Sequence, residues 1–159
     1  MSGPAHARFM RIAVREARKN LVLPDGGPFG ACIVSKGKVI ALARNTVLKE
    51  DATCHAEINA IRKASRRLGT FDLSGCRIYS TTEPCPMCFS AIHWARIEEV
   101  FYGTTISDAR RIGFNELRIN ARFLKKTGGS PVRITSGLLR TECRALLNDW
   151  LSMPSRRVY

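Results

Sequence analysis

The chain has 159 residues, and 26 lysines and arginines against 13 aspartates and glutamates give it a formal net charge of +13. That length suits one domain, and 45% hydrophobic residues can form a core, which excludes a disordered basic tail. Residues 84–95 form the longest run without a formal charge, far short of the ~20 apolar residues that span a membrane. No signal-peptide pattern begins the chain. We expect a soluble, cytoplasmic protein whose residues 1–159 form a single domain.

The apolar pattern predicts helices that alternate with strands. Residues 8–22 have apolar side chains at helical spacing, and the turn-rich segment 24–30 follows them. Residues 31–43 predict a hairpin that turns near Lys36 and Gly37. The later elements are expected to be a helix over 55–68 ended by Gly69, strands over 76–82, 98–105 and 131–137, and helices over 86–96 and 138–151. This alternation predicts an α/β sandwich around one sheet.

The positive charge is concentrated near the carboxyl end. Residues 110–159 hold 11 basic and 3 acidic side chains, a net +8. Clustered lysine and arginine neutralise phosphates, which would indicate a nucleic-acid partner. Basic residues interspersed with apolar ones also occur on an ordinary solvated surface, and both interpretations stay open.

Six cysteines occur in the chain, at positions 32, 54, 76, 85, 88 and 143. A disulfide scaffold is not expected, because the chain lacks a secretory signal and has enough apolar residues for a core. Metal binding or burial accounts for the cysteines better, and Cys54 and Cys76 fit buried positions.

Two short motifs indicate a metal site. His55-Ala56-Glu57 begins the helix expected over 55–68, and Pro84-Cys85-Pro86-Met87-Cys88 follows a strand and begins another helix. Zinc binds imidazole nitrogen and thiolate sulfur, and Cys-x-x-Cys places both sulfurs on one face of a helical turn. His55, Cys85 and Cys88 are therefore the candidate metal ligands.

Glu57 is the candidate catalytic residue. Three protein ligands leave a fourth position for water, as in catalytic zinc sites, whereas structural sites normally have four ligands. Residues i and i+2 of a helix do not share a face, so Glu57 is placed to act as a base on that water, not as a further ligand beside His55. Taken alone, Cys-x-x-Cys is also typical of thioredoxin-like redox pairs, and a single histidine is often structural.

Together, H-x-E and P-C-x-x-C resemble the signature of the cytidine deaminase-like zinc-dependent nucleobase deaminases. This resemblance implies a three-layer sandwich with a mixed five-stranded sheet between helices, one Zn²⁺ per chain, and a homodimer. It also implies a hydrolytic reaction at a ring carbon that bears an exocyclic amine. Glu57 would carry the proton, and ammonia would leave.

Within these deaminases, the stretches GGPFGACIV, DATCHAEINAIRKA, EPCPMCFSAIHWAR and IGFNE are most similar to those of bacterial guanine deaminases. The resemblance implies that Asn45 forms a hydrogen bond with a purine and that Glu116 accepts hydrogen bonds from the N–H groups on one edge of guanine. It further implies substrate contacts from Phe29, Ala56, Trp94 and Tyr159. Tyr159 would close the pocket, often from a partner chain in this family.

Each assignment has a structural alternative. Asn45 would serve equally as a cap at a strand end, and Glu116 as a solvated surface acid. Tyr159 would then be an unpacked end, and Trp94 and Trp150 would be core residues.

The substrate also has alternatives, because residues 131–150 resemble the carboxyl-terminal strand and helix of bacterial tRNA adenosine deaminases. The leading prediction is a guanine deaminase that releases xanthine and ammonia. A tRNA-specific adenosine deaminase is the second, favoured by the basic residues of 110–159. Guanosine or cytosine deamination, and a non-catalytic zinc-stabilised RNA-binding module, complete the alternatives.

Overall fold

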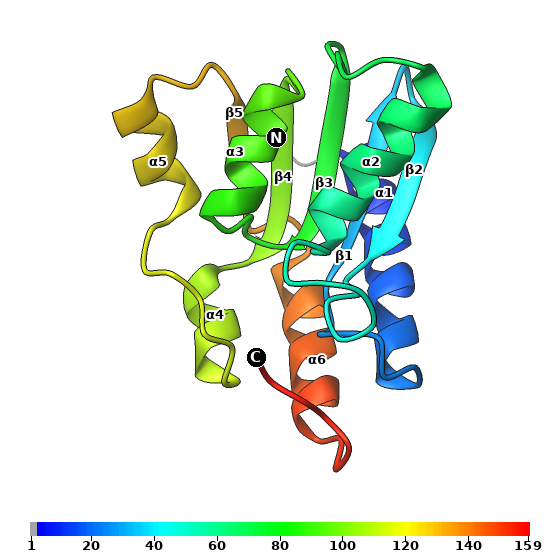
Figure 1. Ribbon diagram of the computed structural model, residues 1–159, viewed down its shortest axis with the longest axis vertical. Coiled ribbons are helices and arrows are strands. Elements are labelled where there is room, and N and C mark those ends of the chain that lie inside the picture. The colour runs from blue at the N-terminus through cyan, green and yellow to red at the C-terminus, as the bar shows by residue number, and fades with distance from the viewer. Residues whose placement is uncertain (1–2) are drawn as a thin grey trace.

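The computed structural model describes residues 3–159, which form one five-stranded sheet with helices on both faces (Figure 1). The strands are β1 (Gly30–Ser35), β2 (Lys38–Arg44), β3 (Cys76–Thr82), β4 (Glu99–Thr104) and β5 (Arg133–Ser136). The helices are α1 (Pro4–Arg18), the short 3₁₀ helix η1 (Lys19–Leu21), α2 (Ala56–Leu68), α3 (Pro86–Trp94), α4 (Ile106–Arg111), α5 (Ala121–Gly128) and α6 (Arg140–Leu151).

The order of the strands brings several chain segments to one edge of the sheet. The order is β2-β1-β3-β4-β5, with β1 antiparallel to both neighbours and β3, β4 and β5 parallel. Thr82 of β3 lies opposite Thr104 of β4, and Gly30 of β1 lies opposite Arg44 of β2. The segments that follow β2, β3 and β4 therefore meet at this edge, where ligands commonly bind in α/β sheets.

Strand periodicity places two large apolar clusters on opposite faces of the sheet. Ile78 of β3 faces α2 and α3, while the next residue, Tyr79, faces α1 and α6. Figure 1 shows α2 and α3 in front of the sheet and α1 behind it. The expected three-layer sandwich with a mixed five-stranded sheet is confirmed.

The expected helices and strands are present, and their observed bounds lie within four residues of the predicted ones. Lys36 and Gly37 turn the hairpin with positive φ angles of 46° and 73°. Gly69 ends α2 in the left-handed conformation, and β3 has the predicted bounds. The helices α4 and α5 were not predicted, because 6 and 8 residues are too few for a clear apolar repeat.

The burial of the cysteines and tryptophans agrees only partly with the predictions. All six cysteines are free thiols, and Cys54 and Cys76 are buried as expected. Trp150 is buried in the core, but Trp94 is 76% exposed, so the core alternative for Trp94 is wrong. Among residues 3–159, no helix has the length and apolar character needed to cross a membrane.

Candidate active site

Three metal-ligating side chains meet where two helices begin. His55 is the N-cap of α2, Cys85 is the N-cap of α3, and Cys88 lies in the first turn of α3. Their ligand atoms all lie within 4.8 Å of one another, and the Sγ of Cys85 is 3.7 Å from Nδ1 of His55. Pro86 is tolerated at the start of α3 because a first-turn N–H has no helical partner to lose. The two helix starts thus hold the predicted ligands together.

The chemistry of this trio fits zinc. Hydrogen bonds from the Cys88 thiol and from His55 lower the pKa of the Cys85 thiol to about 4. The thiolate is the form that binds metal, so Cys85 is in the metal-binding form at neutral pH. One imidazole and two sulfurs match a catalytic zinc site, in which three protein ligands leave one position for water.

Glu57 lies in the first turn of α2, directly beside the metal ligands. Its Oε1 accepts a hydrogen bond from the Ser80 hydroxyl at 3.1 Å, and its Oε2 is 3.6 Å from the Sγ of Cys88. Burial raises the pKa of the Glu57 carboxyl above its usual value. A buried carboxyl that is held on both oxygens and faces the ligand trio is placed to move a proton there.

A cavity of about 180 Å³ adjoins the ligand trio at this edge of the sheet. It is lined by Phe29, Asn45, His55, Glu57, Ser80, Thr82, Glu83, Cys85, Phe114, Asn115, Glu116 and Tyr159. These residues come from the turn before β1, from the carboxyl end of β3, from the segments that follow β2, β3 and β4, from the start of α2 and from the carboxyl-terminal residue.

Asn45 directly follows β2 and is fully buried against the cavity. Its side-chain oxygen accepts hydrogen bonds from the Tyr159 hydroxyl at 2.6 Å and from the backbone N–H of Val47 at 3.1 Å. Because both bonds go to the oxygen, the NH₂ of the amide is left to donate to a ligand in the cavity. A Cβ at Gly26 would collide with this amide, so the turn before β1 requires glycine there.

Glu116 lies in the segment that joins α4 to α5 and brings a further carboxyl to the cavity, beside those of Glu57 and Glu83. Burial is the main cause that raises its pKa to about 7, and the negative charge of Cys85 adds to the rise. An acid in this position accepts hydrogen bonds when ionised and donates one when protonated.

Aromatic rings form one wall of the cavity. Phe114 contacts Phe29 edge-on at a centroid distance of 4.8 Å and Tyr159 edge-on at 5.3 Å. The Tyr159 hydroxyl also accepts from the backbone N–H of Gly27 at 3.1 Å, and burial raises its pKa to about 12. Tyr159 is therefore a packed, neutral residue that closes the cavity from its own chain.

The structure brings most of the predicted site residues together and leaves two outside. Phe29, Asn45, Glu116 and Tyr159 line the cavity with His55, Glu57 and Cys85. Ala56, the first residue of α2, is fully buried in the apolar cluster between this helix and the sheet and does not line the cavity. Trp94 lines a separate surface hollow, because it is the last residue of α3, whereas the metal ligands Cys85 and Cys88 lie at the start of that helix.

Sequence reasoning missed five lining residues: Ser80, Thr82, Glu83, Phe114 and Asn115. Ser80 and Thr82 alternate at the carboxyl end of the predicted strand, which was a usable signal for the edge that bears the ligands. Phe114 and Asn115 belong to the IGFNE stretch that carried the resemblance.

Glu83 is the most informative of these omissions. Its side chain is buried, and its two oxygens accept from the backbone N–H groups of Ile106 at 3.1 Å and Ala121 at 3.0 Å. These are the first residues of α4 and α5. Glu83 therefore anchors both ends of the segment that carries Asn115 and Glu116.

Comparison with known proteins agrees with this geometry. The model of the cytidine and deoxycytidylate deaminase zinc-binding region matches residues 4–104. Guanine deaminase of Bacillus subtilis is 46% identical over 112 residues, 70% of this chain and 72% of the relative. A tRNA-specific adenosine deaminase of Aquifex aeolicus is 44% identical over 95 residues, 59% of this chain and 62% of the relative. The solved guanine deaminase of Nitrosomonas europaea superimposes with a TM-score of 0.84 at 29% identity, covering 96% of this chain and 87% of that one. The chain therefore belongs to the cytidine and deoxycytidylate deaminase zinc-binding family.

Proposed function

We propose that this protein is a zinc-dependent hydrolytic deaminase that converts guanine and water to xanthine and ammonia. The observation that carries the proposal is the pairing of Glu116 and Asn45 on one small cavity with Glu57 and the zinc ligands. The similarity to two guanine deaminases supports the same substrate.

The cavity presents groups that complement the edges of guanine. Guanine carries the donors N1–H and N2–H₂, and a Glu116 carboxylate would accept hydrogen bonds from them. It also carries the acceptors O6 and N7, to which the free NH₂ of Asn45 would donate. Adenine lacks the N1–H and N2–H₂ pair, so the buried carboxylate would stay unpaired beside it, at a cost of about 1–3 kcal/mol.

Glu57 would carry the proton of the reaction. When bound to His55, Cys85 and Cys88, zinc supplies the positive charge that lowers the pKa of a bound water towards ~7. Glu57 would accept a proton from the water that attacks C2 and would deliver it to the exocyclic amine, which leaves as ammonia when the C2–N bond breaks. Ser80 holds Glu57 in the orientation that this transfer requires.

The size of the cavity favours a base over a nucleoside. At about 180 Å³ it is smaller than the ~300–1,000 Å³ typical of pockets for drug-sized ligands. A purine ring that fills it would leave a sugar outside, beyond the wall formed by Phe114 and Tyr159.

A selectivity measurement tests the role of Glu116. In Glu116→Gln the amide presents an NH₂ to the donors of guanine, so kcat/KM for guanine should fall at least tenfold with zinc content unchanged. The matched control is Glu142→Gln, an exposed glutamate of α6 away from the cavity, which should keep full activity. Equal activity of Glu116→Gln and Glu142→Gln on guanine would refute the assignment.

A tRNA-specific adenosine deaminase is the second candidate function. The net charge of +13 and the similarity to tRNA adenosine deaminases favour it. Inosine formation in tRNA without turnover of guanine would establish it in place of guanine deamination.

We also propose a cytoplasmic homodimer built from a single deaminase domain. Phe71 and Trp94 are 64% and 76% exposed and line a surface hollow of about 640 Å³. The hollow also holds charged side chains such as Arg96 and Arg133, and a second copy would cover its exposed apolar residues. Six free cysteines suit a reducing compartment. Sedimentation of Trp94→Arg should show monomers if this hollow is the interface, and an unchanged dimer would exclude it.

A further inference from the structure

A buried asparagine lies next to the cavity but outside it. Asn20 belongs to the 3₁₀ helix η1 that follows α1, it is 3% exposed, and it does not line the cavity. Its side-chain NH₂ donates to the backbone carbonyl of Gly27 at 2.7 Å and to that of Asn45 at 2.8 Å. One amide thus joins the turn before β1 to the segment that follows β2, and both segments supply residues that line the cavity.

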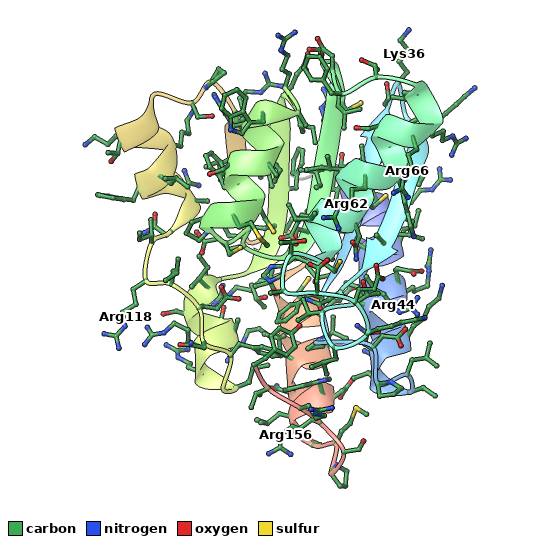
Figure 2. All side chains as sticks on the ribbon, in the orientation of Figure 1. Lys36, Arg44, Arg62, Arg66, Arg118 and Arg156 are labelled. Atoms are coloured by element: carbon green, nitrogen blue, oxygen red, sulfur yellow. The ribbon has the colours of Figure 1, made fainter. Side chains whose placement is uncertain are left out.

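The orientation of the Asn20 amide is fixed by its other partner, Arg44. The Nε of Arg44 donates to the side-chain oxygen of Asn20 at 3.0 Å, and a guanidinium can only donate. The oxygen of Asn20 must therefore face Arg44, and its NH₂ must face the two carbonyls. Arg44 is itself held by ion pairs with Asp25 at 2.6 Å and with Glu16 of α1 at 3.4 Å, and Figure 2 shows it at the end of β2 beside α1.

The two carbonyls that Asn20 holds belong to the residues that orient the substrate-binding amide. The Tyr159 hydroxyl accepts from the N–H of Gly27, so its single proton is left for the side-chain oxygen of Asn45. That oxygen also accepts from the N–H of Val47, and a reversed Asn45 amide would set its NH₂ against this donor. The hydrogen bonds thus have one direction, which leaves the NH₂ of Asn45 for a ligand in the cavity.

We propose that Asn20 is a positioning residue for substrate binding, which acts through Gly27 and Asn45. The ladder between β1 and β2 ends at Gly30 and Arg44, so the separation of Gly27 and Asn45 depends on bonds outside the sheet. The Asn20 amide holds both backbones at the separation that the Tyr159 hydroxyl spans. The inference rests on the proposed function in so far as the Asn45 amide binds guanine.

The test compares Asn20→Asp with the control Asp72→Ala on the zinc-loaded protein. An ionised aspartate has the shape of asparagine but only accepts, so both carbonyls lose their donor while Arg44 keeps its partner. Asp72 accepts hydrogen bonds from Ser74 and Arg96 in the loop before β3, at the end of the sheet opposite the cavity. Asp72→Ala therefore removes hydrogen bonds without touching the site. Asn20→Ser, whose hydroxyl can still donate one of the two bonds, replaces Asn20→Asp if that variant fails to fold.

Kinetics with guanine separate a positioning role from a general loss of stability. Asn20→Asp should raise KM about tenfold with a smaller change in kcat, as expected when about a tenth of the molecules are competent to bind. In an Asn45→Ala background the same substitution should raise KM by no more than about threefold, because residues that act together have non-additive effects. Asp72→Ala, a distant change, should keep KM within about twofold of wild type. Equal factors in both backgrounds, or an unchanged KM in Asn20→Asp, would overturn the role.

Amide hydrogen exchange tests the same role without turnover. The N–H groups of Gly27 and Val47 donate within the arrangement that Asn20 holds. Peptides covering 24–30 and 44–48 should therefore exchange faster in Asn20→Asp than in wild type, and at the wild-type rate in Asp72→Ala. Unchanged exchange of both peptides in Asn20→Asp would overturn the positioning role. Failure of wild type to release ammonia from guanine would count against the proposed function alone, and faster exchange confined to these peptides would still support the role of Asn20.

Discussion

The sharpest structural prediction concerns Glu83, whose buried carboxylate accepts from the first N–H of α4 and of α5 at 3.1 and 3.0 Å. In Glu83→Gln the amide oxygen keeps one of these bonds, and its NH₂ faces the other N–H, donor against donor. A hydrogen bond to a charged group contributes about 1.5–3 kcal/mol, and a neutral one about 1 kcal/mol. One bond is lost and the other weakened, so we expect the free energy of unfolding to fall by about 2–4 kcal/mol.

The same change should reach the substrate, because α4 and α5 hold the two ends of the segment that carries Glu116. A looser segment lowers the population of the binding-competent cavity, so KM for guanine should rise about tenfold with a smaller change in kcat. Urea denaturation gives the stability, and steady-state kinetics at a temperature where the variant is folded gives KM.

Glu98→Gln is the matched control for Glu83→Gln. The Glu98 side chain is half exposed and its nearest cation, Arg133, lies 3.8 Å away, so the loss should stay below about 1 kcal/mol. A Glu83→Gln protein within about 0.5 kcal/mol of wild type, with unchanged KM, would refute the anchoring role that the hydrogen bonds indicate.

Three further predictions test other parts of the site. Cys88→Ala should reduce bound zinc from one ion per chain to a small fraction, measured by atomic absorption, while Cys143→Ala, a buried cysteine far from the trio, should retain it. Tyr159→Phe removes the hydroxyl that orients Asn45 at 2.6 Å, so KM for guanine should rise about fivefold for a loss of about 1 kcal/mol; an unchanged KM would count against the contact. The Glu116 pKa of about 7 means that the accepting carboxylate dominates above pH 7 and is about a tenth of the population at pH 6, so KM should rise about tenfold from pH 8 to pH 6. Glu116→Gln should flatten that profile, and a profile that kept its slope would assign the titration to another group.

The sequence predicted the metal site better than the substrate site, for a physical reason. The metal ligands belong to two short motifs, and each motif lies within one turn at the start of a helix. The three ligands His55, Cys85 and Cys88 therefore meet as soon as these two helix starts lie side by side. Asn45, Glu116 and Tyr159 come from three separate segments, and their meeting depends on the register of the sheet and on the path of the chain after β4.

The wrong prediction for Trp94 and the omission of Glu83 also have structural reasons. Trp94 was placed in the pocket because it shares a helix with the ligands, but α3 is 9 residues long and directs its two ends to different surfaces. Glu83 was overlooked because a glutamate between a strand and a proline carries no sign of burial. Only the tertiary structure shows that the starts of α4 and α5 supply the two N–H donors that hold its carboxylate.

The measurement that tests the central claim most directly is ammonia release by the zinc-loaded protein from guanine, guanosine, adenine, adenosine, cytosine and tRNA. The account predicts xanthine and ammonia from guanine at a rate far above the others, abolished in Glu57→Gln with zinc retained. Turnover confined to adenosine in tRNA, or a Glu57→Gln protein with near-normal turnover, would contradict it.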